Sequence, residues 1–409
     1  YAMCKATGLG NNSLGRVQTP VLATISRRYR ERENHISSDS WPIYISLQKD
    51  GILFKMRRTQ DLPDKESATM FFQDCKLSHQ AQITGISHSV KEILPPDLLD
   101  LTQLQKEANI RYGYTASEVY DIAQSLYEKK LISYPRTSSR YLTEDVFDSL
   151  PPIMACLLSW ELFPAAKGTG GIDISNLSRH VISAEKANVH HAIIITGIRP
   201  GNMSEKEMQV YRLVAGRMLE AFMAPCRIET TNVEAVCAAQ HFKAEQTRII
   251  EAGWHDVFMR YDMIPTSGYS VKELPEVEKG DTLNVCGCNM VHKKQLPVNP
   301  FTDAELVEYM EQNGLGTVSS RTNIIRTLVN RKYIRYSGKY IVPTPKGMFT
   351  YETIRGKKIA DTSLTADWEK QLAGLESGMI TGQDFLNRIR TLAKEMTDDI
   401  FNTYSTKEE

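Results

Sequence analysis

Apolar and polar residues alternate in several stretches of the chain, which is the pattern of β-strands that bury one face. This alternation is clearest at 43–47 and 52–56, and further strand-like stretches are 81–93, 228–236, 248–250 and 282–285. Between the first two, Lys49-Asp-Gly51 is typical of a hairpin turn. We therefore expect a β-rich domain that is assembled from two separated segments, 37–94 and 226–290.

The intervening segment, 95–225, has its apolar residues at helical spacing. Thr115-Ala-Ser-Glu118 and Ser204-Glu-Lys-Glu207 each match a capping box, in which a hydroxyl and a carboxylate satisfy backbone N–H groups at the start of a helix. The first box opens a helix that leads down to Tyr134. This pattern predicts a helical domain inserted between the two halves of the β-rich domain and attached to it by two chain crossings.

The remaining segments, 1–36 and 291–409, are predicted to form a third, helical domain. Its expected elements are helices over 21–32, 302–312 and 318–330 and a hairpin over 332–342. Thr302-Asp-Ala-Glu305 supplies a further capping box for the second of these helices. Helix, turn, helix and hairpin with interspersed basic residues indicate a winged-helix-like nucleic-acid module, although protein-interaction modules share this order of elements.

Composition narrows the class of protein. Hydrophobic residues make up 41% of the 409 residues and charged residues 24%, as in ordinary globular domains. Because no long uncharged apolar run and no signal segment is present, we expect a cytoplasmic protein without membrane contact. The 49 basic and 49 acidic residues give a formal net charge of +0, so binding to nucleic acid requires basic residues to gather on one face. The seven cysteines include no two CxxC units, which argues against a zinc ribbon.

The stretch from Leu131 to Arg140 carries the first candidate chemistry. Pro135 biases Tyr134 away from helical geometry, so the tyrosine is presented where a helix ends. A phenol that titrates near pH ~10 needs neighbouring cations to act as a nucleophile, and Arg136 is two residues away. Taken alone, a tyrosine beside a proline most often packs its ring at a loop.

Two other stretches are candidates for binding phosphate. In Ser13-Leu14-Gly15-Arg16-Val17-Gln18 the glycine lets backbone approach a phosphate, while the arginine and glutamine donate hydrogen bonds to its oxygens. The adjacent histidines His190 and His191 are a weak metal motif because no third ligand stands at a suitable spacing. Two partly buried structural histidines are the ordinary alternative.

These stretches together resemble one family. Ile132-Ser-Tyr-Pro-Arg-Thr137 resembles the active-site motif of type IA DNA topoisomerases. Three more stretches resemble that family's motifs, in the family's order: 13–20, 190–196 and 314–321. The resemblance covers essentially the whole chain and is closest to bacterial topoisomerase III. It implies a multidomain α+β, toroidal fold with a β-rich hinge domain, a helical domain that carries the tyrosine, and a winged-helix-like helical domain.

The resemblance also implies roles for individual residues. Tyr134 would attack a phosphodiester of one DNA strand to give a 5′-phosphotyrosine, which is later religated without ATP. Arg136 and His190 would neutralise charge on the phosphoryl oxygens, and His191 is a weaker candidate. Residues implied to hold the single strand are Ser13, Leu14, Gly15, Arg16, Val17, Gln18, Ser319, Ser320 and Arg321. The expected partners are single-stranded DNA and, as a further substrate, RNA, bound by a monomer.

Two positions and one domain depart from the family pattern. Ser138 stands where the family generally has an acidic residue, and Ile195 stands where it has a proline. The sequence contains no counterpart of the Toprim domain, whose carboxylates hold Mg²⁺ in the family. We therefore expect a fragment that binds no metal itself, belongs to a Mg²⁺-dependent parent enzyme and is inactive alone.

Two other classes of protein remain open. A non-catalytic fragment for single-stranded nucleic-acid binding or protein interaction would use Tyr134 only as a packed ring. A tyrosine recombinase also forms a phosphotyrosine, but it places its tyrosine near the C-terminus, after a His-x-x-Arg motif. Tyr134 precedes both His190 and His191, so this class ranks lowest.

Overall fold

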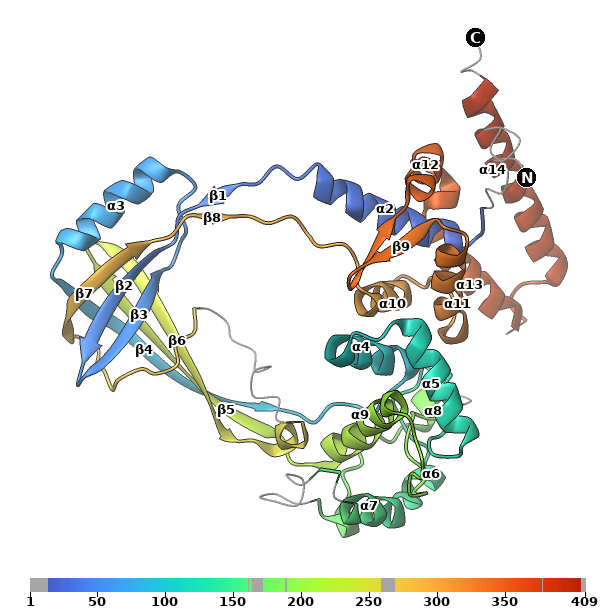
Figure 1. Cartoon of the computed structure of the whole chain (residues 1–409), viewed down its shortest axis with the longest axis horizontal. Coiled ribbons are helices and arrows are strands. Elements are labelled where there is room, and N and C mark those ends of the chain that lie inside the picture. The colour runs from blue at the N-terminus through green and yellow to red at the C-terminus, as the bar shows by residue number, and fades with distance from the viewer. Residues whose placement is uncertain are drawn as a thin grey trace.

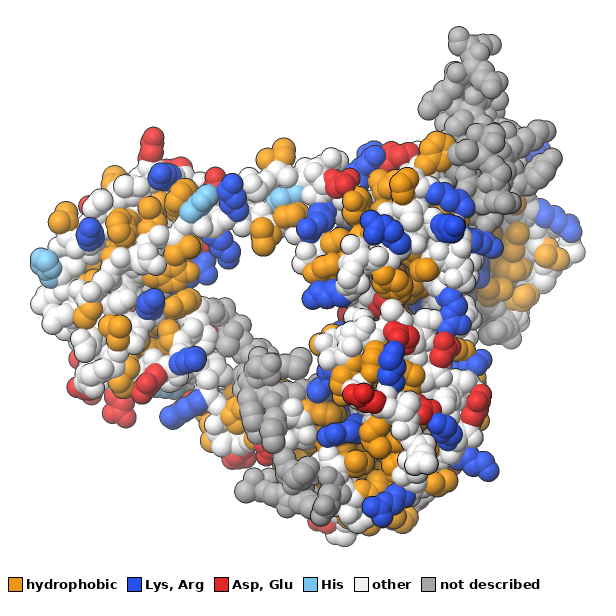
Figure 2. Space-filling model, viewed as in Figure 1, with side chains coloured by type: hydrophobic (Ala, Val, Ile, Leu, Met, Phe, Trp, Pro, Cys, Tyr) orange, Lys and Arg blue, Asp and Glu red, His pale blue; other side chains and the backbone are white. Residues whose placement is uncertain are grey.

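The chain forms a ring around an opening that is visible in both the ribbon and the space-filling views (Figure 1; Figure 2). The computed structural model describes residues 14–160, 162–163, 172–187, 190–258, 269–376 and 378–405. A β-barrel lies on one side of the ring and two groups of helices lie on the other, joined to the barrel by two extended arms. The expected toroidal α+β fold is confirmed.

Six antiparallel strands close the barrel in the order β2-β3-β6-β5-β4-β7. They are β2 (Ile43–Lys49), β3 (Ile52–Arg58), β4 (Gln80–Ile93), β5 (Cys226–Cys237), β6 (Gln240–Glu251) and β7 (Thr282–Met290). The predicted turn joins β2 to β3, and Gly51 adopts φ +81° there, which its lack of a Cβ permits. Alternate residues such as Ile45 and Phe54 fill the barrel interior.

Strand pairing in the barrel joins distant parts of the sequence. β2 pairs with β7 and β3 pairs with β6, so the segments before and after the helical insertion build one structure. Helix α3 (Lys65–Leu77) packs against β7 and was not anticipated. Its signal was Asp64, whose side chain accepts a hydrogen bond from the backbone N–H of Ser67 at the helix start.

The helices between β4 and β5 surround one hydrophobic cluster, to which all of those named below except α8 contribute. It extends from Leu98 to Met223 and includes Val257. They are α4 (Leu101–Tyr112), α5 (Ala116–Glu128), α6 (Glu144–Asp148), α7 (Leu150–Ser159), α8 (Ala184–Ala187) and α9 (Glu205–Phe222). The capping boxes predicted for α5 and α9 are both formed. The two crossings to the barrel are β4 and β5 themselves, which stay paired as far as Ile93 and Cys226 and make one two-stranded arm.

A second group of helices surrounds the N-terminal helix α2 (Gln18–Glu33). Its other elements are α10 (Asp303–Gln312), α11 (Val318–Asn330), the hairpin β9 (Ile334–Ser337) and β10 (Tyr340–Pro343), α12 (Pro345–Ile354), the short 3-10 helix η5 (Lys358–Ala360), α13 (Thr362–Glu376) and α14 (Gly382–Ser405). Helix α2 starts three residues before the predicted 21, because Pro20 falls in the first turn, where no backbone N–H is needed. The short strands β1 (Asp39–Ser40) and β8 (Lys293–Lys294) pair on the second arm.

The contact between the two groups of helices is mostly polar. Gln105 of α4 donates to the Thr322 hydroxyl of α11 at 2.9 Å. Lys106 pairs with Glu308 of α10 at 2.7 Å. Ala116 is the residue of α5 that joins the apolar cluster around α2. Hydrogen bonds and ion pairs, rather than a common apolar core, therefore hold this side of the ring together.

The sequence predicted no contact with a membrane, and the structure bears on this prediction through its helices. None of the helices in the described ranges combines the length and apolarity that spanning a bilayer requires.

Candidate active site and strand-binding surface

The loop that carries Tyr134 is paired with the histidine loop. Ser133 N–H donates to the Ile194 carbonyl at 2.8 Å, and Thr196 N–H donates to the Leu131 carbonyl at 3.2 Å. These two bonds flank an antiparallel bridge between Ile132 and Ile195. The backbone that leads into the tyrosine is thereby fixed relative to the segment that follows His191.

Tyr134 contacts two rings. Its ring centroid lies 4.5 Å from the imidazole of His190, and the ring of Tyr127 meets it edge-on at 5.5 Å. The Tyr134 side chain is half-buried, and within the described ranges its hydroxyl has no hydrogen-bond partner. The hydroxyl is therefore available to an incoming group while the ring is held in place.

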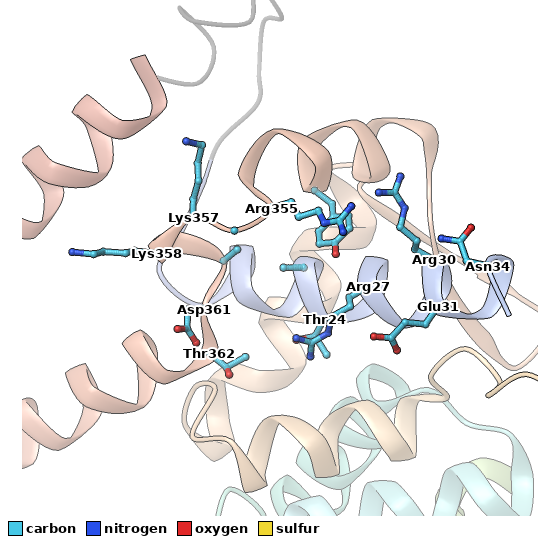
Figure 3. A pocket seen from close by; sticks show the side chains of 14 residues that line it. Thr24, Arg27, Arg30, Glu31, Asn34, Arg355, Lys357, Lys358, Asp361 and Thr362 are labelled. Carbon is cyan, nitrogen blue, oxygen red and sulfur yellow. The ribbon is translucent and has the colours of Figure 1, made fainter. Parts of the chain in front are cut away.

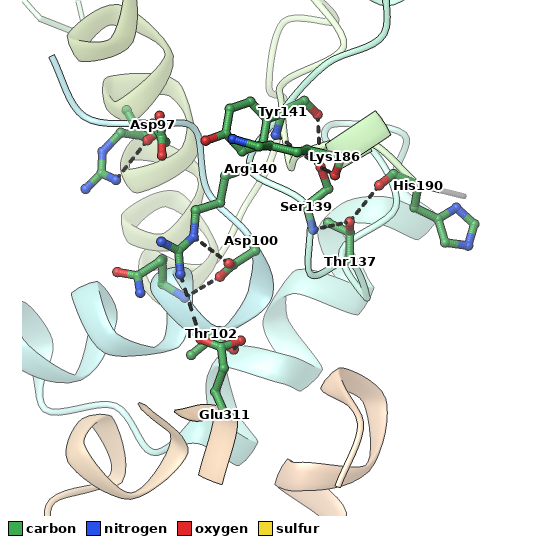
Figure 4. Close-up of polar contacts among 12 residues, drawn as sticks. Asp97, Asp100, Thr102, Thr137, Ser139, Arg140, Tyr141, Lys186, His190 and Glu311 are labelled. Carbon is green, nitrogen blue, oxygen red and sulfur yellow. Dashed lines mark hydrogen bonds and ion pairs between the residues drawn. The ribbon is translucent and has the colours of Figure 1, made fainter. Parts of the chain in front are cut away.

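Two buried hydroxyls hold the backbone at His190. Thr137 donates from its hydroxyl to the His190 carbonyl at 2.9 Å, and the N–H of Ser139 donates to that same hydroxyl oxygen at 3.0 Å (Figure 4). Ser139 in turn donates to the Lys186 carbonyl at 2.8 Å. The stretch after Tyr134 thus positions the histidine as well as the tyrosine.

Arg136 lies against helix α5 rather than against Tyr134. Its Nη2 donates to Gln124 at 3.1 Å, and its guanidinium lies 5.1 Å from the ring centre of Tyr120. Its buried Nε has no hydrogen-bond partner. Tyr120, Gln124 and Tyr127 follow each other at helical spacing, so one face of α5 supports both Arg136 and Tyr134.

His191 and Ile195 have separate, local roles. The Nδ1 of His191 lies 2.7 Å from the carbonyl oxygen of the adjacent Ala192, so this imidazole is bound to its own backbone. The N–H of Ile195 is not used in the bridge to Ile132 and instead donates to the sulfur of Met218 at 3.1 Å. A proline at this position would therefore remove no backbone-to-backbone hydrogen bond.

A charged network connects the tyrosine loop to the second group of helices. Arg140 pairs with the buried Asp100 at 2.7 Å and reaches Glu311 of α10 at 3.7 Å. Glu311 also binds Arg321 at 3.0 Å and accepts a hydrogen bond from the Thr102 hydroxyl. Burial raises the pKa of the Asp100 carboxyl above its ordinary value, and the Arg140 charge acts in the opposite direction.

Sequence reasoning did not single out Asp100 or Glu311, because nothing near either residue indicates its partner. The one local signal is that Asp100 caps α4 through the N–H of Gln103. Ser138, where an acidic residue was expected, is exposed and lines a cavity of about 550 Å³. The carboxylates of Glu185 and Glu311 line the same cavity, so negative charge is present around this position.

The residues expected to hold the strand lie at two helix starts. Leu14 through Gln18 lead into α2, whereas Ser13 lies outside the described residues. The two starts are close together. Gly316, which stands just before α11, is so near Val17 that a Cβ added to the glycine would lie 3.7 Å from the Val17 side chain and 2.8 Å from the Ser320 hydroxyl. Arg331 at the end of α11 also donates to the Gln18 side chain at 2.9 Å.

The candidate strand-binding residues differ in how their side chains are placed. The guanidinium of Arg16 lies 5.5 Å from the ring centre of Trp368, and Ser320 caps α11 together with Thr317. Arg321 is 8% exposed and bound to Glu311 and Thr102, so it holds the two groups of helices together rather than facing an open surface. In this conformation Arg321 therefore lies at the contact between the two groups of helices, and its expected role in holding the strand stays a prediction.

Within the described ranges, no three His, Cys, Asp or Glu side chains are placed to hold a metal ion. The residues present thus do not fit a Mg²⁺ site.

Comparison with known proteins agrees with the fold and shows the family. A family model described as DNA topoisomerase matches residues 2–387. DNA topoisomerase 3 of Bacillus licheniformis is 30% identical over 413 residues, which cover 95% of this chain and 56% of that protein. DNA topoisomerase 1 of Methanocaldococcus jannaschii is 30% identical over 401 residues, covering 97% of this chain and 50% of that protein.

A solved structure shares the fold. Full-length topoisomerase I of Thermotoga maritima aligns with a TM-score of 0.73 at 22% identity, covering 95% of this chain and 64% of that one. The chain spans about half the length of the DNA topoisomerases that it matches in sequence. Since the family match extends over nearly all of its residues, the chain belongs to the type IA DNA topoisomerase family.

Proposed function

We propose that this chain supplies the strand-cleaving tyrosine and the strand-gripping surface of a type IA DNA topoisomerase. The Tyr134 oxygen attacks the phosphorus of one strand, forms a 5′-phosphotyrosine and leaves a free 3′-hydroxyl. The reverse attack by that hydroxyl restores the strand. Because the phosphotyrosine keeps the energy of the broken bond, the cycle needs no ATP.

One observation carries this proposal. The Tyr134 hydroxyl has no hydrogen-bond partner in the described ranges, while its ring is held by His190 and Tyr127 in a loop fixed by backbone pairing. A tyrosine that served only packing would not need an available hydroxyl beside an imidazole. Membership of the topoisomerase family adds to this argument.

His190 and Arg136 are assigned to the charge on the phosphoryl oxygens. His190 touches the Tyr134 ring and carries an exposed imidazole. Arg136 keeps one buried guanidinium nitrogen, Nε, without a partner, and this N–H can turn to a phosphate that enters the site. Removing one donor that stabilises such developing charge commonly costs ~10²–10³ in rate.

The strand is proposed to follow the two neighbouring helix starts. Arg16 and Gln18 at α2 and Ser319 and Ser320 at α11 offer guanidinium, amide and hydroxyl groups to the phosphates. Gly15, whose N–H already donates to the Thr19 hydroxyl, leaves room for a phosphate to approach the backbone. The same backbone chemistry suits RNA. Arg321 lies beneath this surface and supports it through its ion pair with Glu311.

Passage of a second strand requires the ring to open. We assign three bodies: a helical body, 95–225, that carries Tyr134; a β-rich hinge, 37–94 with 226–290; and a strand-gripping body, 1–36 with 291–409. The polar contact of α4 with α10 and α11 supports separation at that side, since water can replace its hydrogen bonds. The paired β4 and β5 would remain as the connection.

The family's Mg²⁺ has no site among the described residues, and no step above is routed through it. Its carboxylates have no counterpart in this sequence. We therefore expect the 409 residues alone to bind single-stranded DNA without relaxing supercoiled DNA.

Tyr134→Phe tests the assignment, because it deletes the nucleophilic oxygen and keeps the ring. In the longest natural chain that contains these residues, the variant should form no covalent DNA adduct on a denaturing gel. Its affinity for single-stranded DNA should match that of the unmodified chain. Adduct formation by the Phe variant would exclude Tyr134 as the nucleophile and favour a role in binding only.

The two histidines form a matched pair for the second test. His190→Ala should slow cleavage by about 10²-fold or more with little change in strand affinity, because its role is felt as charge develops. His191→Ala should have the smaller effect, since its ring is bound to the Ala192 carbonyl. A reversed ranking would assign the role to His191.

A further inference from the structure

A groove of about 900 Å³ runs along one face of α2 and is closed on its other side by the turn between α12 and α13 (Figure 3). None of residues 14–18 or 319–321 lines it. The groove therefore begins where the strand-gripping surface proposed above has ended, farther along the same helix. Its α2 side includes Arg27, Arg30 and Asn34, which follow helical spacing.

The groove concentrates positive charge in a chain whose formal net charge is +0. Its lining contains five cationic side chains and two carboxylates, which are those of Glu31 and Asp361. The cations are Arg27, Arg30, Arg355, Lys357 and Lys358. Figure 2 shows Lys and Arg side chains gathered over the group of helices to which the groove belongs. The lining thus suits an anion of repeated charge.

The cations differ in how far they are already engaged. Arg27 is exposed and makes no ion pair or hydrogen bond within the described ranges. Arg355 is 60% exposed and lies 4.0 Å from Glu352, whereas Arg30 holds the same carboxylate at 2.6 Å. Arg27 and Arg355 are therefore the two cations most available to a ligand.

The shape and lining of the groove indicate which part of a nucleic acid it would contact. The aromatic residue in the lining, Tyr351, is only 6% exposed and offers no face for stacking a base. From Arg27 to Asn34 the helix rises about 10 Å, the axial length of about three nucleotides in one strand of a duplex. Contacts of this kind recognise a phosphate backbone and carry no sequence information.

From these observations we infer that the groove is a second nucleic-acid-binding site, which holds a phosphodiester backbone through Arg27, Arg30 and Arg355. The inference goes beyond the strand path at residues 14–18. The backbone belongs either to a single strand or to a duplex that flanks the cleavage site, and both share the chemistry that the groove recognises. The experiment below separates the two sources.

Helix α14 competes with this ligand for the end of the groove. Its Asp399 pairs with Lys357 at 3.1 Å, and its Glu395 pairs with Lys358 at 3.0 Å. These carboxylates occupy the two lysines that a phosphate would otherwise contact. Displacement of α14 from the lysines would add two cations to the site.

The experiment measures fluorescence anisotropy of a labelled eight-nucleotide strand and, separately, of a labelled twelve-base-pair duplex with the 409-residue chain. Arg27→Glu with Arg355→Glu removes the two available groove cations. Arg248→Glu, at a 69% exposed cation of β6, is the control for charge reversal at another surface. Arg16→Ala with Gln18→Ala weakens the strand path proposed earlier. Circular dichroism and thermal melting confirm that each variant is folded.

The groove variant should lose roughly tenfold or more in affinity for at least one ligand, and its salt slope should fall by about 0.7–0.9 for each lost phosphate contact. Loss for the strand alone identifies single-stranded nucleic acid, and loss for the duplex alone identifies flanking duplex. Arg248→Glu should bind as the unmodified chain does. The strand-path variant should retain the groove component of binding.

Unchanged affinity of the groove variant for both ligands would overturn the inference. So would complete loss of binding in the strand-path variant, which would leave the proposed function intact. Unchanged binding in the strand-path variant, with loss in the groove variant, would instead overturn the strand path and keep the groove.

Glu395→Gln with Asp399→Asn tests the competing helix. Because the Lys358–Glu395 pair is exposed and Lys357 keeps its hydrogen bond to the Asp399 carbonyl oxygen, this variant should bind only about two- to fivefold more tightly. Equal or weaker binding would remove the competing role of α14.

Discussion

Asp303→Asn should make the stability of this protein less dependent on pH. Asp303 is 2% exposed and stands at the first position of α10, against the start of α5. Its carboxylate accepts hydrogen bonds from the backbone N–H of Ala116 at 3.2 Å and from the Tyr336 hydroxyl at 3.1 Å. Burial, supported by the nearby charge of Glu118, raises the pKa of Asp303 to about 6.

The sign of the effect follows from the direction of this shift. The folded carboxyl has a higher pKa than the unfolded one, at 3.8, so the folded state binds the proton more tightly. The resulting stability is complete below the unfolded pKa and is lost as pH rises through about 6. A shift of roughly two units corresponds to about 3 kcal/mol of unfolding free energy. Asparagine cannot ionise, so the variant lacks this contribution to the pH profile.

Urea unfolding of both proteins from pH ~4 to pH ~8 measures the difference. Subtracting the profile of the variant cancels the groups that the two proteins share. The unmodified protein should lose about 2 kcal/mol relative to the variant across this range, because the contribution is not yet complete at pH ~4. Asp121→Asn, an exposed carboxylate at the same contact, serves as the control. Parallel profiles for the unmodified protein and Asp303→Asn would refute the argument from the buried carboxylate.

Three further outcomes are expected. Gly347→Ala should destabilise the fold by about 2–3 kcal/mol, because the added Cβ would lie 2.0 Å from the Tyr333 carbonyl oxygen; an unchanged urea midpoint would contradict this. Ile195→Pro should destabilise the fold by about 1–3 kcal/mol, because it removes no backbone-to-backbone hydrogen bond but trims a fully buried side chain of the helical cluster, and a much larger loss in urea unfolding would show a stricter backbone requirement. Residues 1–409 should not relax supercoiled plasmid at any Mg²⁺ concentration on agarose gels, and relaxation would reveal an acidic site that the sequence analysis missed.

Local signals predicted local structure well. The boxes that begin at Thr115, Ser204 and Thr302 are all formed, because each depends only on side chains within three residues of the helix start. The helix predicted over 318–330 is α11, with the same bounds. The closed barrel was not predicted, because a strand's alternation shows that it has a buried face and does not show which distant strand it pairs with.

In the candidate site, too, features that depend on local sequence were predicted, and features that depend on distant partners were not. The sequence motifs located Tyr134 and His190, and the structure brings their rings into contact. The inward turn of Arg321 could not be predicted, since its partners Glu311 and Thr102 come from two other helices. An arginine beside two serines has the same sequence pattern whether it faces a phosphate or a buried carboxylate.

The pairing of Ile93 with Cys226 also constrains the order in which the protein can fold during its synthesis. About 130 residues must be synthesised after β4 before its partner β5 leaves the ribosome. At ~5–20 residues per second this synthesis takes roughly 7 to 26 seconds. β2 waits longer, until β7 is synthesised. The intervening helices have their own apolar cluster and can fold during that delay. The early hairpin of β2 and β3 cannot bury its apolar face until synthesis has passed β7, and this half-built sheet is the stage of biogenesis most exposed to aggregation.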